Sequence, residues 1–177
     1  MATLGHVAVG MATGRMSQRR GTSRRRLILS MVLLSALALL PDADVIAFAL
    51  GIPYDAEWGH RGAAHSLGFA AMFACVAALA AWPLRIGPAR TGVAVFVALA
   101  SHGFLDIFTD GGLGIALFWP ISNARHFAPW QPIPVAPIGL GFLSARGLAV
   151  LCTEAVFFAP LFVIALWPRR PAHEGEP

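Results

Sequence analysis

Charged residues are scarce in this chain: they make up 12% of its 177 residues, whereas hydrophobic residues make up 57%. Soluble domains carry about twice that share of charge. The composition therefore argues against an ordinary soluble domain and favours an all-α, polytopic membrane protein. We expect a single membrane-embedded helical domain over residues 1–168, followed by a disordered tail over residues 169–177.

Lysine is absent, so all 13 basic residues are arginines. Six of them lie between Arg15 and Arg26, directly before a long apolar run. A basic segment beside a membrane span fixes the topology of the chain or contacts anionic lipid headgroups. We therefore expect no nucleic-acid partner, despite the net charge of +4.

Cysteine is scarce as well, and its placement excludes two kinds of site. Cys75 and Cys152 lie inside apolar segments and share no CxxC spacing. We expect neither a disulfide nor a thiolate metal site from this pair. A cleaved signal peptide is not expected either, because the basic cluster follows the first apolar stretch instead of preceding it.

Apolar segments predict about four full transmembrane helices. They cover residues 27–52, 63–82, 91–108 and 147–167. The first of these is interrupted by "PDAD" at residues 41–44. A shorter apolar stretch over residues 2–13 predicts an N-terminal helix that either spans the membrane or lies at its interface. Residues 110–146, rich in proline and glycine, predict a cap on the outer face.

Arginine sets the orientation. With the cluster from Arg15 to Arg26 in the cytoplasm, only Arg61, Arg125 and Arg146 of the 13 arginines lie outside. The reverse orientation would invert this count, so the positive-inside rule favours the first choice. Arg169 and Arg170, after the last span, belong to the inner set.

Within that topology, histidines and aspartates from separate segments reach one level of the bilayer. At about 1.5 Å rise per residue, each pair falls in the outer third of the membrane. The three pairs are Asp42 with Asp44, His60 with His65, and His102 with Asp106. The inner side carries no comparable set, so the pairs predict a common site near the outer leaflet.

Each element alone leaves more than one interpretation open. His102 and Asp106 are four residues apart on one helix face, which suits a shared cation, an oriented imidazole or a plain hydrogen bond. "PDAD" fits a turn or a ligand pair, because carboxylates inside an apolar run are costly. "HRGAAHS" fits an interfacial loop capped by Ser66 or a pair of ligands.

Two further residues are less defined. His6, on the N-terminal stretch, suits a packed histidine as well as a ligand. Glu154, an acid inside the fourth span, either pairs with Arg146 two turns earlier or lines the same cavity as the other acids.

Several imidazoles and carboxylates without a thiolate suit zinc, manganese or iron in an open site. A metal with a free coordination position makes a water nucleophilic at neutral pH. One of the acids, Asp42 or Asp44, would then serve as general base. Arg61 and Arg125 would bind an anionic substrate such as a phosphate ester.

The blocks "LGHVAVG", "LLPDADV", "GHRGAAHS", "SHGFLDIFTDGGLGIALFWPIS" and "ARHFAPWQPIPVAPIG" occur in this order. Together, from His6 to Glu154, they resemble the bacterial YdjM-type family, described as LexA-regulated, membrane-bound, metal-dependent hydrolases. The HxxxD element is also similar to one in zinc-dependent phospholipase C and the S1/P1 nucleases. Two positions depart from the family: Ala64 replaces a usual Thr or Ser, and Gly5 replaces a more usual Thr.

The resemblance implies a set of metal ligands, namely His6, Asp42, Asp44, His60, His65, His102 and Asp106. It implies a hydrolase of the bacterial inner membrane, with zinc, or else manganese or iron, activating a water. The expected substrate is a lipid or other amphiphile with a phosphoester-like bond. Two alternatives remain: a non-catalytic metal-binding membrane protein, and a proton- or ion-coupled transporter, for which no internal repeat is visible.

Overall fold

The structure is a computed structural model that describes residues 2–137 and 139–168. Over these residues it consists of helices and loops and contains no strand, so the all-α prediction is confirmed. The expected tail over residues 169–177, including Arg169 and Arg170, lies outside the described residues.

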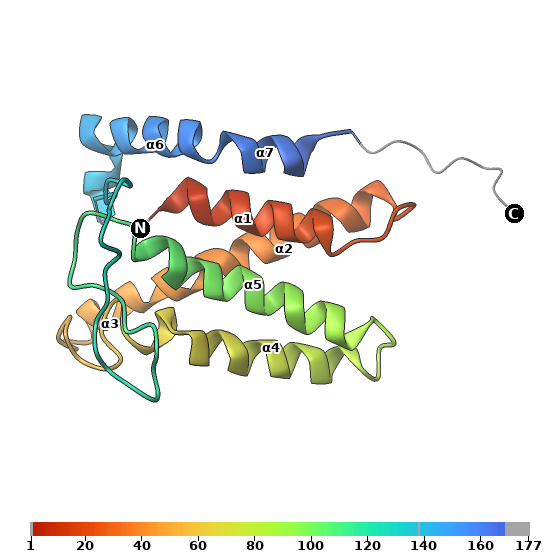
Figure 1. The fold of residues 1–177 in the computed structure, drawn as a ribbon, viewed down its shortest axis with the longest axis horizontal. Coiled ribbons are helices and arrows are strands. Elements are labelled where there is room, and N and C mark those ends of the chain that lie inside the picture. The colour runs from red at the N-terminus through yellow and green to blue at the C-terminus, as the bar shows by residue number, and fades with distance from the viewer. Residues whose placement is uncertain (1, 138, 169–177) are drawn as a thin grey trace, which may run out of the picture.

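Helices α1 (Thr3–Met16) and α2 (Arg24–Leu39) form a hairpin whose turn carries the arginine cluster (Figure 1). The two helices approach closely at glycines. A Cβ added at Gly10 would lie 2.4 Å from Ser35 Cα, and one added at Gly14 would lie 2.6 Å from Met31 Cα. Such backbone contact at small residues is typical of helix pairs in membranes, where large side chains gain nothing by being buried.

After α2 the chain tightens into a 3₁₀ helix, η1 (Leu40–Val45), and continues into the short helix α3 (Ile46–Ala49). Pro41 stands in the first turn of η1 and cannot donate a backbone hydrogen bond, which favours a break in the regular α-helix here. Because of this break, Asp42 and Asp44 of "PDAD" lie within η1 rather than on a regular α-helix.

Helices α4 (Leu67–Ala81) and α5 (Pro88–Asp106) form a second hairpin. Ser66 caps α4 by accepting a hydrogen bond from Phe69 N–H at 3.0 Å, as the loop interpretation of "HRGAAHS" had it. Small side chains dominate the core that joins this hairpin to α2, formed by Leu34, Ala38, Ala70, Ala74, Ala94, Val95, Ala98, Leu99 and Ala100.

The last two helices, α6 (Ala145–Phe157) and α7 (Ala159–Leu166), meet at an angle of 61°. Ahead of them lie a 3₁₀ turn, η3 (Gly139–Leu143), and Ser144, which caps α6 through Gly147 N–H. Pro160 stands in the first turn of α7, where its missing N–H is tolerated. Figure 1 shows this pair running alongside α1.

The expectation of four full spans needs correction. One continuous helical stretch, Arg24–Ala49, is long and apolar enough to cross a membrane, and the bent pair α6–α7 is a second if counted as one span. The cap at Ser66 leaves α4 with only 15 residues. In α5, polar residues at both ends, from Arg90 to His102 and Asp106, reduce the apolar length. The number of spans supported by length and composition is therefore one or two.

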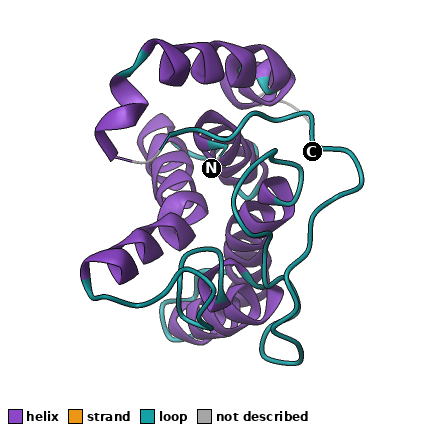
Figure 2. Cartoon of the chain, turned by 90° about the vertical axis from the view of Figure 1, so that its left-hand side faces the viewer, coloured by secondary structure: helices purple, strands orange, loops and turns teal. Residues whose placement is uncertain are grey.

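The two long loops lie at one end of the bundle, opposite the turn between α1 and α2 (Figures 1 and 2). They comprise residues 50–62, which lead into the 3₁₀ turn η2 (Ala63–His65), and residues 107–137. Two isolated bridges, Thr109 with Ile133 and Ile115 with His126, order the second loop. Its backbone also pairs with the first loop, since Ala116 N–H donates to Arg61 O at 3.1 Å. The end of the bundle is thus covered.

Candidate metal centre

All seven histidines and aspartates singled out by the sequence lie together under this cap. They come from α1, η1, η2, α5 and the loop before η2, and their side chains are buried or nearly so. Two groups have ligand atoms within 4.8 Å of one another: Asp42, His65, His102 and Asp106, and then Asp44, His60 and His65. The structure therefore places a group that can hold a metal ion where the sequence pattern expected one.

His102 projects from α5 with one ring nitrogen fixed. Its Nδ1 lies 2.6 Å from the carbonyl oxygen of Ala38. A carbonyl only accepts, so Nδ1 carries the proton and Nε2 of the neutral ring has a lone pair. That lone pair faces the cluster, 3.1 Å from His65 Nε2 and 3.3 Å from Asp42 Oδ1. A backbone carbonyl that holds the far nitrogen in this way is the usual support of a metal-ligating histidine.

His65 ends η2 and enters from the opposite side. Its Nε2 lies 3.5 Å from Asp42 Oδ1, and its Nδ1 lies 3.0 Å from Asp44 Oδ2, in a contact less linear than a hydrogen bond. The ring reaches this depth because α5 approaches the η2 backbone at a glycine. A Cβ added at Gly103 would lie 2.0 Å from the carbonyl oxygen of His65. Gly103, next to His102, therefore brings the two imidazoles together.

Asp44 is occupied by neighbouring protein groups. Its Oδ1 lies 2.6 Å from His60 Nδ1, and its Oδ2 accepts the Arg61 backbone N–H at 3.1 Å. His60 in turn stacks on Tyr54, with ring centroids 5.3 Å apart. This arrangement suits Asp44 to orienting His60 and His65 more than to a place in the Asp42 group.

His6 lies beside the first group. Its ring stacks on that of His102 with centroids 3.7 Å apart, and its Nε2 lies 3.3 Å from Asp106 Oδ1. The side chain is fully buried, and neither ring nitrogen makes a hydrogen bond within the described residues. His6 belongs to neither group of ligand atoms within 4.8 Å of one another, so it lies beside the Asp42 group.

Arg61 is buried at the floor of the cluster, with its backbone in the left-handed region at φ 64°. Its Nη2 lies 3.5 Å from Asp106 Oδ2 and donates to Thr109 Oγ1 at 3.0 Å, while Nη1 donates to the Gly111 carbonyl. The sequence suggested an anion-binding role for Arg61. In the structure its guanidinium contacts protein acceptors and faces Asp106.

Arg125 also makes its contacts to the protein. Its guanidinium donates to the backbone carbonyls of His60 and Tyr54 at 3.0 Å and of Ala56 at 3.1 Å. Burial lowers the pKa of Arg125 below its usual value. These contacts tie the loop over residues 107–137 to the loop over residues 50–62, so Arg125 fixes the cap above the cluster.

The sequence analysis missed three supporting groups. The Ala38 carbonyl is a backbone group, so the residue type gives no indication of its role. Thr109, buried, donates to the Asp106 carbonyl at 2.8 Å and accepts from Arg61. Tyr54 has one usable indication, since it is the single tyrosine of the chain and lies six residues before His60.

Glu154 takes neither of the roles expected for it. Instead of Arg146 or the cluster, its Oε2 accepts the backbone N–H of Leu4 at 2.6 Å, in the first turn of α1. Asp110 likewise lies outside the cluster, and its Oδ1 accepts the Val135 N–H at 2.7 Å.

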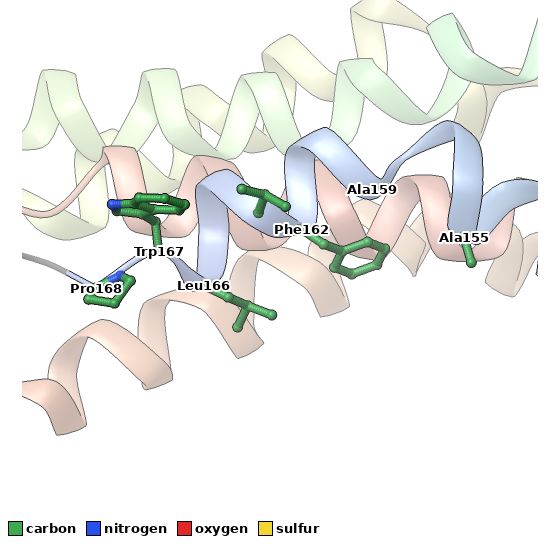
Figure 3. A pocket seen from close by; sticks show the side chains of 7 residues that line it. Ala155, Ala159, Phe162, Leu166, Trp167 and Pro168 are labelled. Atoms are coloured by element: carbon green, nitrogen blue, oxygen red, sulfur yellow. The ribbon is translucent and has the colours of Figure 1, made fainter.

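A shallow groove of about 450 Å³ lies elsewhere, along α6 and α7 (Figure 3). Its lining is apolar throughout: Ala155, Ala159, Phe162, Val163, Leu166, Trp167 and Pro168. With no titratable or ligating side chain, it is not part of the candidate metal centre.

Comparison with known proteins agrees with the resemblance read from the motifs. A family model described as "YdjM inner membrane protein" matches residues 1–170. The inner membrane protein YbcI of Escherichia coli (strain K12) is 41% identical over 140 residues, which cover 76% of this chain and 80% of that protein. No solved structure matches the chain.

Proposed function

The chain belongs to the YdjM inner membrane protein family, and we propose that it is a metal-dependent hydrolase of that membrane. Its metal would be held by Asp42, His65, His102 and Asp106, with His6 beside them. The observation that carries the proposal is the contact between His102 Nε2 and Asp42 Oδ1 at 3.3 Å. Both atoms present lone pairs, because the His102 proton is held at Nδ1 by Ala38.

The charge of the cluster also favours a cation. Asp42 and Asp106 lie in one buried group, and the Arg61 guanidinium lies 3.5 Å from Asp106. Asp42 and Asp106 contribute ligand atoms to the same buried group, so their negative charges lie close together. Like charges at this separation repel unless a proton or cation lies between them. A divalent ion balances this charge.

The donor set indicates the metal. Imidazole nitrogens and carboxylate oxygens without a thiolate suit zinc, manganese or iron. Bound here, such an ion would supply Lewis acidity and make a water nucleophilic at neutral pH.

Asp42 is the residue best placed to act as general base. Its Oδ1 faces the two imidazoles, whereas no hydrogen bond from the described residues reaches Oδ2. With Asp44, it is also the member of the cluster nearest to the surface, at 8% exposed. Oδ2 would accept the proton of the attacking water. The Ala38 carbonyl would orient the His102 ring, Asp44 would orient the His65 ring, and Arg61 would fix Asp106.

The surroundings of Asp42 support a lipid or amphiphilic substrate. Leu40, Ile46 and Phe48, which flank it on η1 and α3, are all exposed. A water-soluble phosphate ester would meet an apolar rim there, whereas a lipid or amphiphile would match it. We infer a phosphoester-like bond of a membrane lipid as the target.

The surface of the bundle supports a multi-pass position in the membrane. Large apolar side chains are exposed on α2, α4, α5 and α6, among them Val32, Leu33, Val76, Leu79, Val93 and Val156. Soluble monomers rarely expose so many, whereas lipid-facing helices do. We infer that α1, α4 and α5 lie in the bilayer as shorter helices beside the longer spans. With the arginine-bearing turn in the cytoplasm, the metal centre faces the outer side.

The test of turnover uses protein purified in mild detergent and loaded with zinc or manganese. Phospholipids with phosphomonoester and phosphodiester headgroups are offered in mixed micelles, and release of phosphate or headgroup is measured. We expect release that chelator abolishes and that Asp42→Asn lacks. Asp55→Asn, which changes an exposed carboxylate of the neighbouring loop, is the matched control and should keep full activity.

A second candidate is a metal-binding protein without turnover. The burial of His6, His65, His102 and Asp106, all at 1% exposure or less, favours an enclosed ion that stabilises the fold. Stoichiometric metal together with no release from any phospholipid would favour this second function over hydrolysis.

A further inference from the structure

The bent pair α6–α7 contacts the bundle in a restricted way. Among the described helices, both pack on α1 and on no other helix of the bundle, apart from each other and η3. Figure 1 shows the pair lying along the outer side of α1, away from α4 and α5. Phe158, at the bend of the pair, also shares an apolar cluster with Ile133 of the cap loop. Among the helices, α1, which carries His6, is the route from the pair to the metal centre.

The first contact is a helix cap supplied from another helix. The first N–H groups of a helix lack intrahelical acceptors, and Ala2 at the start of α1 has no side chain that can accept from them. Glu154 of α6 replaces the missing cap, since its Oε2 accepts the Leu4 N–H at 2.6 Å. The Glu154 side chain is buried at 1% exposure, and no arginine or histidine of the described residues pairs with it. A carboxylate is favourable at this end of a helix.

The second contact lies one residue further along α1, at Gly5. Phe158, at the bend between α6 and α7, is buried and its ring lies against Gly5. A Cβ added at Gly5 would lie 2.5 Å from Phe158 Cε2, so the ring rests directly on the backbone. The next residue is His6. Cap and ring together fix the turn from which the His6 side chain projects.

A third contact holds the far end of α1. Arg15 Nη1 donates to the Ala165 carbonyl of α7 at 3.2 Å. The bent pair thus grips α1 near both ends, about three turns apart. Rotation or sliding of α1 along the bundle would break these contacts.

We propose that α6–α7 is a clamp on α1 and that Glu154 is a positioning residue for the metal centre. Glu154 holds the first turn of α1, and this turn holds the His6 ring between His102 and Asp106. The inference rests on the proposed metal centre and extends it to an acid that lies outside it. It explains why a carboxylate is buried in an apolar helix without a cationic side chain.

The test uses the full chain in detergent with cobalt(II), whose visible spectrum reports the ligands of the ion. His6→Ala should change the wild-type spectrum and weaken cobalt binding. Glu154→Ala should change the spectrum in the same direction and weaken binding by about tenfold, as loss of a supporting group does. Adding Glu154→Ala to His6→Ala should cause no further loss, because the two act through one ligand.

Two variants separate positioning from general damage. Glu154→Gln keeps an oxygen that accepts the Leu4 N–H, and it should bind cobalt within about threefold of wild type. Arg15→Ala removes the contact at the other end of α1 and should leave the spectrum unchanged. Additive losses in the double variant, or a folded Glu154→Ala with the wild-type spectrum and affinity, would overturn the proposal. A folded Glu154→Gln as weak as His6→Ala would do the same.

A measurement without metal keeps the clamp testable if Glu154→Ala does not fold or if cobalt does not bind. Hydrogen exchange of residues 3–8 is compared in metal-free wild type and Glu154→Gln, and with Phe158→Leu, which shortens the ring over Gly5. We expect wild type and Glu154→Gln to be equally protected and Phe158→Leu to exchange faster in this turn alone. Unprotected residues 3–8 in folded wild type would refute the clamp, whereas absent cobalt binding would refute only the metal centre.

Discussion

His102 Nδ1 lies 2.6 Å from the carbonyl oxygen of Ala38, which joins α5 to the last turn of α2. This contact links two elements that are distant in sequence. Ala38 lies just before η1, the element that contains Asp42. The bond fixes the His102 tautomer, so that Nε2 presents a lone pair to Asp42 and His65. The chemistry proposed for the cluster depends on this one assignment.

Asp42→Asn should remove metal binding while the fold is kept. The amide has nearly the shape of the carboxylate but no charge, so the cluster loses a ligand and also part of its repulsion. We expect metal affinity to fall by at least about a hundredfold, measured by competition with a chromophoric chelator. Metal-free Asp42→Asn should melt at or above the temperature of metal-free wild type; a lower value would contradict the repulsion argument.

Asp44→Asn should weaken the site without abolishing it. Asp44 contacts His60 Nδ1, His65 Nδ1 and the Arg61 N–H, so it supports the ligands instead of joining the Asp42 group. Loss of such support costs about 10–100-fold in metal affinity. Equal losses for Asp44→Asn and Asp42→Asn in the same competition assay would show that Asp44 is itself a ligand.

Gly103→Ala should displace His65. The new methyl would meet the His65 carbonyl at 2.0 Å, and the backbone must move to relieve this contact. We expect a loss of about 1–3 kcal/mol in stability together with weaker metal binding. Gly92→Ala on the same helix is the control, since its nearest neighbour would lie at 3.1 Å. Similar losses for both variants in denaturant titrations would rule out a special role for Gly103.

Arg61 should resist conservative replacement. Its guanidinium reaches Asp106, Thr109 and Gly111 at once, and a lysine ammonium cannot make this fork of contacts. Removing one partner of a buried ion pair costs about 3–5 kcal/mol. We therefore expect Arg61→Lys and Arg61→Met to be comparably destabilised in thermal melts. Full stability of Arg61→Lys would mean that charge alone is needed at this position.

Orientation in the membrane is open to a labelling experiment. Ile121, in the cap loop, is 94% exposed. Arg25 lies exposed in the first turn of α2, at the opposite end of the bundle. After Cys75 and Cys152 are replaced by alanine, an impermeant maleimide added outside intact cells should label Ile121→Cys and spare Arg25→Cys. The opposite result would place the metal centre on the cytoplasmic side.

The site residues predicted from the sequence were polar or charged residues within apolar segments. Asp42, His102 and Asp106 stand out in apolar runs, because charged or polar side chains there need a reason. The helix cap at Ser66 could also be anticipated from the sequence, since it depends only on a serine directly before the helix. These signals were enough to predict that the histidines and aspartates lie close together.

The parts that could not be predicted depend on contacts between distant segments. The Ala38 carbonyl and the partner of Glu154 are set by how α5 and α6 pack, which no spacing encodes. The number of spans was wrong because apolar length overestimates helix length: α4 begins only after Ser66. The contacts of Arg61 and Arg125 depend on where the loops fold back.

The central claim is tested most directly by counting metal ions in the purified protein. Wild type and His102→Ala are prepared in mild detergent, exposed to zinc, passed through a desalting column and measured by inductively coupled plasma mass spectrometry. We predict about one or more zinc ions per chain in wild type, at least about tenfold less in His102→Ala, and a melting temperature that rises with zinc only in wild type. Folded wild type without retained zinc, manganese or iron, and with no such rise, would contradict the account.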